Sequence, residues 1–123
     1  MTSYYYIILK TSFMNQFLIL VRGKYHEISP EETQKSLAKF GEWVQKTLDG
    51  RYVAGAPLEN DDARLLKSKT EVLTDGPFLE SKEMISGYMI FNAKDIQEAI
   101  ELTAKCPLLG QYELEIRKLK PMM

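Results

Sequence analysis

Two short segments of this chain are apolar at every position. Residues 17–21 read Phe-Leu-Ile-Leu-Val, and residues 87–91 read Gly-Tyr-Met-Ile-Phe. Successive side chains of a strand point to opposite faces of a sheet, so a strand with one solvated face alternates apolar and polar residues. Neither segment alternates. The pattern therefore predicts two strands whose side chains need cover on both faces of the sheet.

Two helices are predicted, one after each of these strands. The first begins at Ser29-Pro30, where a serine cap precedes proline at the first helical position and Glu32 is placed for a capping box, and it ends at Asp49-Gly50. The second runs from Asp95 to Pro107. Trp43 lies at the edge of the first apolar stripe. The expected inner faces are Leu37, Phe40, Gly41, Val44 and Leu48 in the first helix, and Ile96, Ala99, Ile100, Thr103 and Ala104 in the second.

The remaining segments complete an α+β plan. Residues 52–58 read as a strand, and Gly55 and Pro57 predict that it is bulged or at a sheet edge. Residues 63–73 predict one or two short hairpin strands. Residues 112–119 alternate as a final strand. The order predicts a ferredoxin-like βαββαβ antiparallel sheet with inserted hairpin strands.

Two helices can cover one face of such a sheet and no more. The other face would carry leucine, isoleucine, methionine and phenylalanine, a larger apolar patch than monomers usually expose. A second copy of the same sheet is the simplest cover. We therefore expect a homodimer in which two sheets face each other.

Composition limits the other possibilities. The length of 123 residues predicts one domain. With 16 basic and 17 acidic residues, the chain has no net positive charge that would attract nucleic acid. The chain has a single cysteine, Cys106, which excludes an intrachain disulfide. One cysteine and one histidine do not form a metal-binding motif. No apolar run is long enough to span a membrane. We expect a cytoplasmic protein without a cofactor. Residues 1–13 are expected to be a disordered or peripheral extension of a domain at 14–123.

The charged segment between the hairpin and the second apolar strand is the main candidate for function. Asp75-Gly76 is a dipeptide typical of turns, and Pro77 favours an extended conformation at Gly76. The segment is also long for a hairpin loop, and long ordered loops are often functional. Asp75 is either a turn residue or a general base. Lys82 and Glu83 are either a solvated pair or an anion-binding residue and its orienting partner. Tyr88 belongs either to the core, to an interface or to a site.

The final strand adds a second group of charges. Glu113, Glu115 and Arg117 project from the side opposite Leu114 and Ile116, toward the expected dimer interior. Buried charges require partners, so Arg117 should pair with Glu115 or Asp75, and the same side chains could line a polar ligand cavity. Arg22, at the end of the first strand, is either solvated or part of that cavity.

These residues also carry a resemblance. The segments Thr74-Asp75-Gly76-Pro77-Phe78, Glu80-x-Lys82-Glu83 and Gly87-Tyr88 resemble the DGPF-motif branch of the YCII-related proteins over about residues 15–119. The resemblance implies a dimeric α/β barrel of ferredoxin-like subunits. Better-studied relatives resemble small enzymes with a His–Asp pair, the histidine in the first helix and the aspartate before a proline. Here His26 precedes the helix and Cys106 precedes Pro107, so that dyad is not carried over.

Three functional hypotheses follow. The first is a homodimer that binds a small polar or anionic ligand through Arg22, Asp75, Lys82, Glu83, Tyr88, Glu115 and Arg117. Its pocket would be formed by the 75–88 loop, the last strand and the partner. The second is a cofactor-independent enzyme with Asp75 as base and Lys82 or Arg117 as anion stabiliser. The third is a structural or regulatory module.

Overall fold

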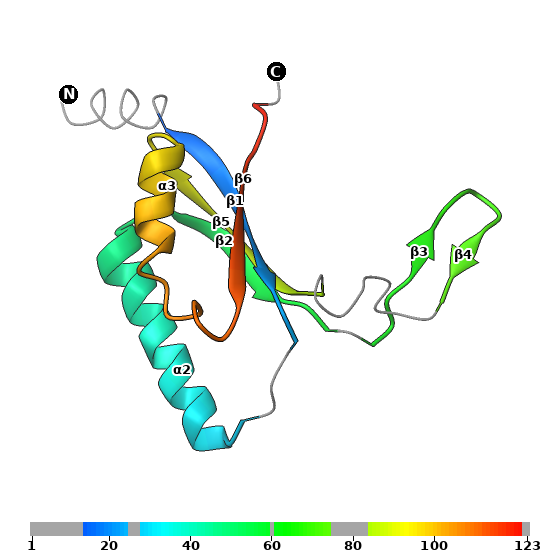
Figure 1. The fold of residues 1–123 in the computed structure, drawn as a ribbon, viewed down its shortest axis with the longest axis horizontal. Helices are drawn as coiled ribbons and strands as arrows, with labels where there is room; N and C mark the ends of the chain where they lie inside the picture. Colours follow the sequence, from blue (N-terminus) through cyan, green and yellow to red (C-terminus); the bar gives the residue numbers. More distant parts are fainter. Residues whose placement is uncertain (1–13, 25–27, 60, 75–83, 122–123) are drawn as a thin grey trace, which may run out of the picture.

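The computed structural model describes residues 14–24, 28–59, 61–74 and 84–121. Its main sheet has four strands in the order β2-β5-β1-β6, and every neighbouring pair is antiparallel. Both long helical segments lie on one face of this sheet (Figure 1). The α+β, ferredoxin-like prediction is confirmed. The strands are β1 (Asn15–Arg22), β2 (Tyr52–Pro57), β5 (Ile85–Ala93) and β6 (Glu113–Lys118).

The two predicted helix starts are both capped as expected. Helix α2 (Pro30–Glu42) begins after Ser29, whose Oγ accepts a hydrogen bond from the Glu32 backbone N–H at 3.2 Å. Helix α3 (Ile96–Thr103) begins after Asp95, whose Oδ1 accepts from the Glu98 N–H at 2.8 Å. Each cap satisfies an N–H that has no partner within its helix. None of the described helices is long and apolar enough to cross a membrane.

Helix α2 continues directly into a π-helical segment, η1 (Trp43–Leu48). Its last turn is closed by a hydrogen bond from the Asp49 N–H to the Val44 carbonyl at 3.1 Å, five residues back. Asp49 then adopts a left-handed conformation with φ of 47° and ends the helix. The predicted stop at Asp49-Gly50 is therefore confirmed.

Trp43 is part of the core, and its predicted place at the edge of the helix stripe is wrong. Only 4% of its surface is exposed, and its ring lies 5.6 Å from that of Phe40 and 6.3 Å from that of Phe91. Its Nε1–H donates to the Leu102 carbonyl at 3.1 Å. The π-helical turn widens the helix, so positions from Trp43 onward depart from the period of 3.6 residues on which the prediction relied.

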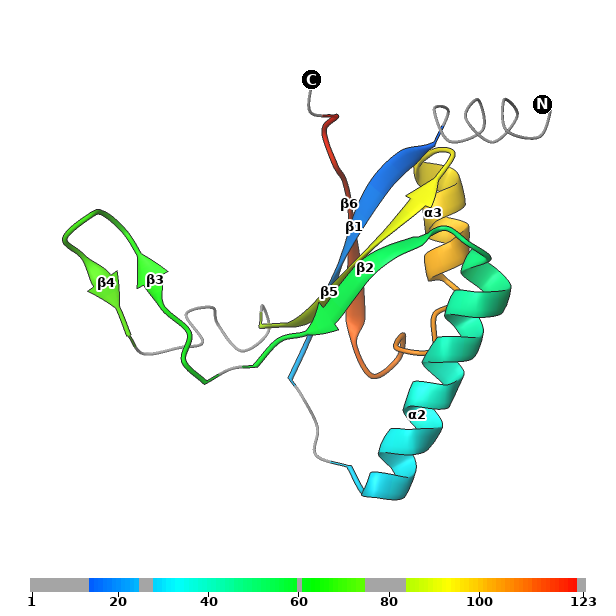
Figure 2. The same ribbon diagram turned by 180° about the vertical axis from the view of Figure 1, so that it is seen from behind.

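Three leucine and isoleucine side chains expected to point inward are instead exposed. Leu37 of α2 is 66% exposed, and Ile96 and Ile100 of α3 are 49% and 45% exposed. The first half of α2 extends beyond the edge of the sheet (Figure 2). In α3 the inward positions are the small residues Ala99 and Thr103, with Leu102 packed beside them.

Strand β2 is an edge strand, as its glycine and proline predicted. Its pairing with β5 slips between Tyr52 and Ala54. A Cβ at Gly55 would lie 2.8 Å from the Tyr88 carbonyl oxygen and 2.6 Å from the Tyr52 hydroxyl, so only glycine permits this close approach of β2 and β5.

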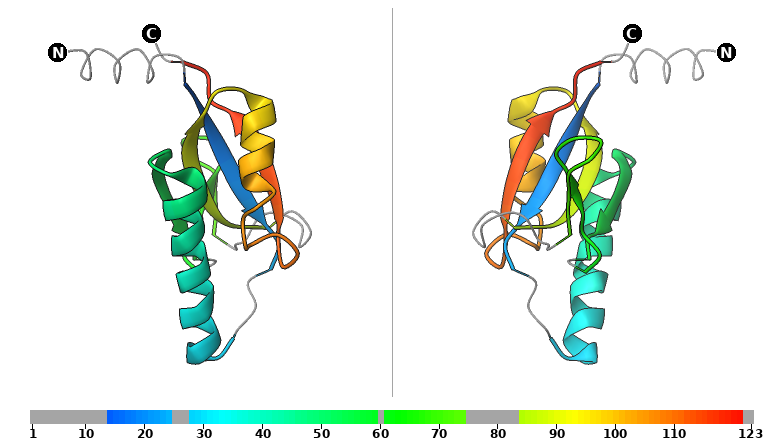
Figure 3. Two further views of the ribbon diagram at one scale, coloured as in Figure 1. Left: turned by 90° about the vertical axis from the view of Figure 1, so that its left-hand side faces the viewer. Right: turned by 90° about the vertical axis from the view of Figure 1, so that its right-hand side faces the viewer.

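The inserted hairpin strands form a separate two-stranded sheet, β3 (Leu65–Leu66) and β4 (Val72–Leu73). Residues 61–74, hereafter the arm, extend from the body on the side of the main sheet opposite the helices (Figures 1 and 3). The Ser68 Oγ accepts hydrogen bonds from the Thr70 and Glu71 N–H groups at 3.3 and 3.1 Å and closes the arm's turn.

Candidate functional site

The main sheet has one face without helices, and most of the predicted site residues lie on it. Phe17, Ile19 and Val21 of β1 are buried on the helix side, so the alternate residues of β1 point the other way. Pairing register carries this alternation to the neighbouring strands. The face, hereafter the open face, includes Leu18, Leu20 and Arg22 of β1, Tyr88 and Ile90 of β5, and Glu113, Glu115 and Arg117 of β6.

The open face is apolar at its centre and charged at one side. Leu20 pairs with Tyr88 on one neighbour and Glu115 on the other, and Leu18 pairs with Ile90 and Arg117. These central side chains are half-buried. The prediction that the first strand carries apolar residues on both faces is therefore confirmed, as is the projection of the β6 charges from the face opposite the helices.

Glu115 lies between two arginines. Its Oε1 is 2.5 Å from Nη1 of Arg22, and its Oε2 is 3.3 Å from Nη1 of Arg117. The predicted pairing of Arg117 with Glu115 is confirmed. Arg22 reaches Glu115 diagonally across the β1–β6 pair, because Leu20 is the residue directly opposite Glu115. Each carboxylate oxygen thus binds a different guanidinium group.

The two arginines fix the charge of Glu115. The hydrogen bond from Arg22, followed by that from Arg117, lowers the pKa of the Glu115 carboxyl below its ordinary value. A carboxylate with a lowered pKa is a poor proton acceptor at neutral pH. The chemistry available to this cluster is therefore electrostatic, namely the presentation of two guanidinium groups on the open face.

Arg117 is the more available of the two arginines. Its side chain is 66% exposed, against 27% for Arg22. A guanidinium has five N–H donors in a planar fork that matches carboxylate and phosphate groups. Since only Nη1 contacts Glu115, most of the Arg117 donors face solvent. Arg117 can therefore bind an added anion without breaking the cluster.

A bulge at the end of β1 lies beside residues 84–86, the described residues that follow the charged loop. Pairing of β1 with β5 shifts between Val21 and Arg22, and the Ser86 hydroxyl donates to the Gly23 carbonyl. The Gly23 N–H donates to the Met84 carbonyl at 2.9 Å, so the chain rejoins the sheet from residues 75–83 beside Arg22. Bulges often lie next to functional sites because they redirect a strand. Sequence reasoning missed Ser86, whose only signal is its place before Gly87.

The predicted site residues fall into two groups. Arg22, Glu115 and Arg117 form one cluster, and Tyr88 shares the open face with them. Asp75, Lys82 and Glu83 lie outside the described residues, so their places in the site stay predictions. His26 also lies outside them.

Comparison with protein families settles the family. The model of the YCII-related domain matches residues 15–123, almost the whole chain. The chain belongs to the YCII-related family. A search of the curated proteins gave no match to this YCII-related protein.

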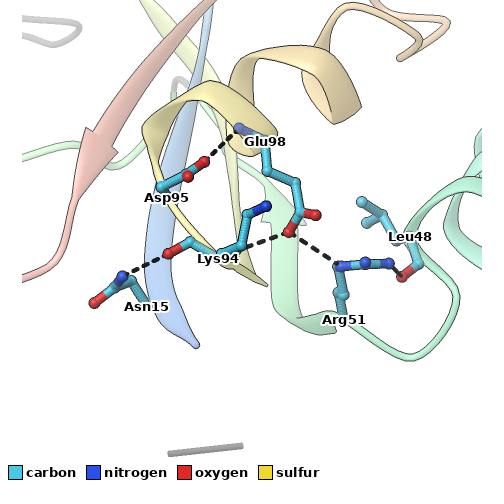
Figure 4. A network of polar contacts seen from close by, with 6 residues as sticks. All are labelled: Asn15, Leu48, Arg51, Lys94, Asp95 and Glu98. Carbon is cyan, nitrogen blue, oxygen red and sulfur yellow. Dashed lines mark hydrogen bonds and ion pairs between the residues drawn. The ribbon is translucent and has the colours of Figure 1, made fainter. Parts of the chain in front are cut away.

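The YCII-related protein has a second polar cluster, at the other end of β1 (Figure 4). Glu98 Oε1 accepts from the Lys94 N–H at 2.8 Å and lies 3.7 Å from Nε of Arg51. Arg51 also donates to the Leu48 carbonyl at 3.0 Å, and the Asn15 side chain donates to the Lys94 carbonyl at 2.9 Å. These bonds join the ends of β1, η1 and α3. Since each of the hydrogen bonds has a backbone atom as one partner, we interpret this cluster as structural.

The cysteine of this YCII-related protein lies in the core. Cys106 is 4% exposed, and burial raises the pKa of its thiol. A raised pKa lowers the fraction of the Cys106 side chain that is present as thiolate, and the thiolate is the reactive form. Within the described part of the chain, no three histidine, cysteine, aspartate or glutamate residues are grouped to hold a metal ion.

Proposed function

We propose that this YCII-related protein is a homodimer that binds a small polar or anionic ligand between its subunits. The pocket would be formed by the open face around Glu115 and Arg117, the 75–88 loop and the partner subunit. The observation that carries the proposal is the cluster in which Arg22 and Arg117 share one carboxylate beside an apolar centre. Small-molecule sites typically combine apolar walls with a few placed polar groups.

The dimer is proposed because the open face carries apolar side chains that no helix covers. Leu18 and Leu20 of β1 and Ile90 of β5 lie side by side on two paired strands. Among the described residues of the face, the charged ones are two arginines and two glutamates, so their formal charges balance. A two-fold related copy would therefore meet the face without net repulsion.

We propose an anion as the ligand because Glu115 and Arg117 differ in how far their partners already occupy them. Glu115 is already engaged by two guanidinium groups, whereas most donors of Arg117 face solvent. The bond between Gly23 and Met84 brings the end of the charged loop beside Arg22. Lys82 would then add a further cation to the pocket, and Glu83 would orient it.

A cofactor-independent enzyme is the alternative. The lowered pKa of Glu115 disfavours this carboxyl as a base, so the base would have to be Asp75, with Lys82 or Arg117 stabilising the developing anion. An Asp75→Asn variant that binds but does not turn over would support the enzyme. The buried Cys106 thiol fits a protein of the reducing cytoplasm.

Thermal unfolding in the presence of small anions tests the binding proposal. The panel would contain inorganic phosphate and aliphatic and aromatic carboxylates, measured on wild type, Arg117→Ala and Lys118→Ala. Lys118 follows Arg117 in β6 and pairs with Phe17, so it lies on the helix side and provides a control of equal charge change. An anion at tenfold its dissociation constant would add about 1.4 kcal/mol, or roughly 5 °C.

We expect one class of anion to raise the melting temperature of wild type and Lys118→Ala while leaving Arg117→Ala unchanged. The proposed site is wrong if no anion stabilises wild type. It is equally wrong if Arg117→Ala responds as fully as Lys118→Ala does.

A further inference from the structure

The arm is a hairpin whose apolar side chains are exposed on both of its faces. Leu65 pairs with Leu73, and Leu66 pairs with Val72, so each pair lies on a different face. The first pair is 39% and 37% exposed, and the second is 66% and 45% exposed. The Leu66–Val72 face is therefore the less covered one.

Such a hairpin is not expected to be stable by itself in water. Each of its strands has two residues, and an isolated two-stranded hairpin is marginal even when longer. Exposure of four apolar side chains on one short hairpin also exceeds what scattered surface hydrophobic residues explain. The arm thus needs a surface to pack against.

The direction of the arm indicates which surface this is. The helices cover one face of the main sheet, and the arm stands out from the other side, near β2 and β5 (Figures 1 and 3). It therefore projects from the same side as the open face. A molecule that covers the open face would therefore lie on the same side of the sheet as the arm.

The size of the open face gives a second reason to involve the arm. Four strands about 4.8 Å apart, with six to nine residues each rising about 3.3 Å, span a flat area of roughly 400–600 Å². Stable interfaces of standard size bury about 800 Å² on each partner. The open face is of the order of one such interface, and the arm is an adjoining apolar surface that adds contact area to it.

We infer that the arm clasps a second copy of this chain. In a two-fold dimer built on the open face, each arm extends past the sheet of its partner and packs its Leu66–Val72 face on the partner's body. The two arms thereby bury two Leu66–Val72 pairs per dimer and add contact area to the sheet interface. This inference takes its occupant, the second copy, from the proposed dimer.

A matched pair of leucine variants tests the inference. Leu66 in the arm and Leu37 in α2 are both 66% exposed, but Leu37 lies on the helix side, away from the open face. Sedimentation equilibrium of the full chain would give the dimer dissociation constant for wild type, Leu66→Ser and Leu37→Ser. Since each dimer has two arms, we expect Leu66→Ser to raise the constant on the order of 100-fold, and Leu37→Ser to leave it unchanged.

Photo-crosslinking from position 66 gives a second readout, with p-benzoylphenylalanine in place of Leu66. In a mixture of isotope-labelled and unlabelled chains, a clasped arm gives crosslinked peptides that contain one labelled and one unlabelled partner. Crosslinks confined to single chains would mean that the arm packs on its own body, and the inference would be wrong.

The two proposals fail in different ways. A stable dimer whose dissociation constant is the same for Leu66→Ser and Leu37→Ser overturns the clasp and leaves the ligand site standing. A monomeric wild type at micromolar concentration overturns both the clasp and the shared pocket. Anion binding that is insensitive to Arg117→Ala overturns the site alone.

Discussion

The indole Nε1 of Trp43 donates a hydrogen bond to the carbonyl oxygen of Leu102 at 3.1 Å. This bond joins the end of the first helical segment to α3, 59 residues later in the chain, beneath the sheet. The same ring also contacts Phe40 and Phe91. Trp43 therefore holds both helices and the central strand β5 together.

Truncation of Trp43 is expected to be costly. We expect Trp43→Phe to lower the free energy of unfolding by about 1–2 kcal/mol, through the lost hydrogen bond and ring volume. Trp43→Ala should cost about 3–5 kcal/mol. Urea titration followed by circular dichroism measures both. Leu37→Ala, at a 66% exposed position, is the control and should change stability by less than about 0.5 kcal/mol.

Two glycine-to-alanine substitutions should act in opposite directions. At Gly55 a new Cβ would meet the Tyr88 carbonyl oxygen at 2.8 Å, and this backbone atom cannot move without disturbing β5. We expect Gly55→Ala to cost about 1–3 kcal/mol. At Gly41, in α2, a new Cβ would meet nothing within 4 Å. We expect Gly41→Ala to stabilise by about 0.5–1 kcal/mol. Equal effects of the two variants in urea titrations would contradict the packing between β2 and β5.

Acid should weaken the Arg22–Glu115–Arg117 cluster. The pKa of the Glu115 carboxyl is lower in the folded protein than in the unfolded chain, where it is roughly 4.3. The ionised Glu115 therefore contributes fully to stability at pH values above the unfolded pKa, and this contribution is lost as the pH falls through the folded pKa. Glu115→Gln should therefore be less stable than wild type at neutral pH. The difference should shrink as the pH falls below about 4.

Direct titration of the Glu115 carboxyl by NMR separates the two arginines. Arg22→Ala should raise the pKa of Glu115 more than Arg117→Ala does, because the hydrogen bond from Arg22 is the larger cause. A larger effect of Arg117→Ala would show that the order of the two contacts is reversed in solution.

Cys106 should react slowly in the native protein. Burial both raises the pKa of its thiol and blocks access, so modification requires local opening. We expect labelling with an aromatic disulfide reagent at pH 8 to be about 100-fold slower, or more, than in urea. A native rate within a few-fold of the denatured rate would place Cys106 at the surface.

Much of the fold could be predicted from local signals. The continuous apolar runs of β1 and β5, the caps at Ser29 and Asp95, and the αL stop at Asp49 each act within a few residues, so the sequence displays them directly. The position of Trp43 could not be predicted in this way, because the π-helical turn changes the helical period. Leu37 was misplaced because periodicity finds an apolar stripe but does not indicate which of its positions the rest of the protein covers.

The site could be predicted only in part, for a similar reason. Glu115 and Arg117 are two residues apart in one strand, so their pairing follows from the alternation of β6. The contact between Arg22 and Glu115 spans 93 residues and depends on the register of β1 with β6. A slip of one residue would turn one of the two side chains to the other face. Register of this kind arises from tertiary packing.

Strands β2 and β5 are direct neighbours, with Pro57 opposite Gly87. The chain between them could reverse in a tight turn, and the arm is instead a detour inserted at that point. The pairing of β2 with β5 therefore does not depend on the sequence of the arm. The arm can therefore be replaced at this junction by a shorter loop or by a recognition peptide from another protein. Such a replacement would change which chains associate with this one.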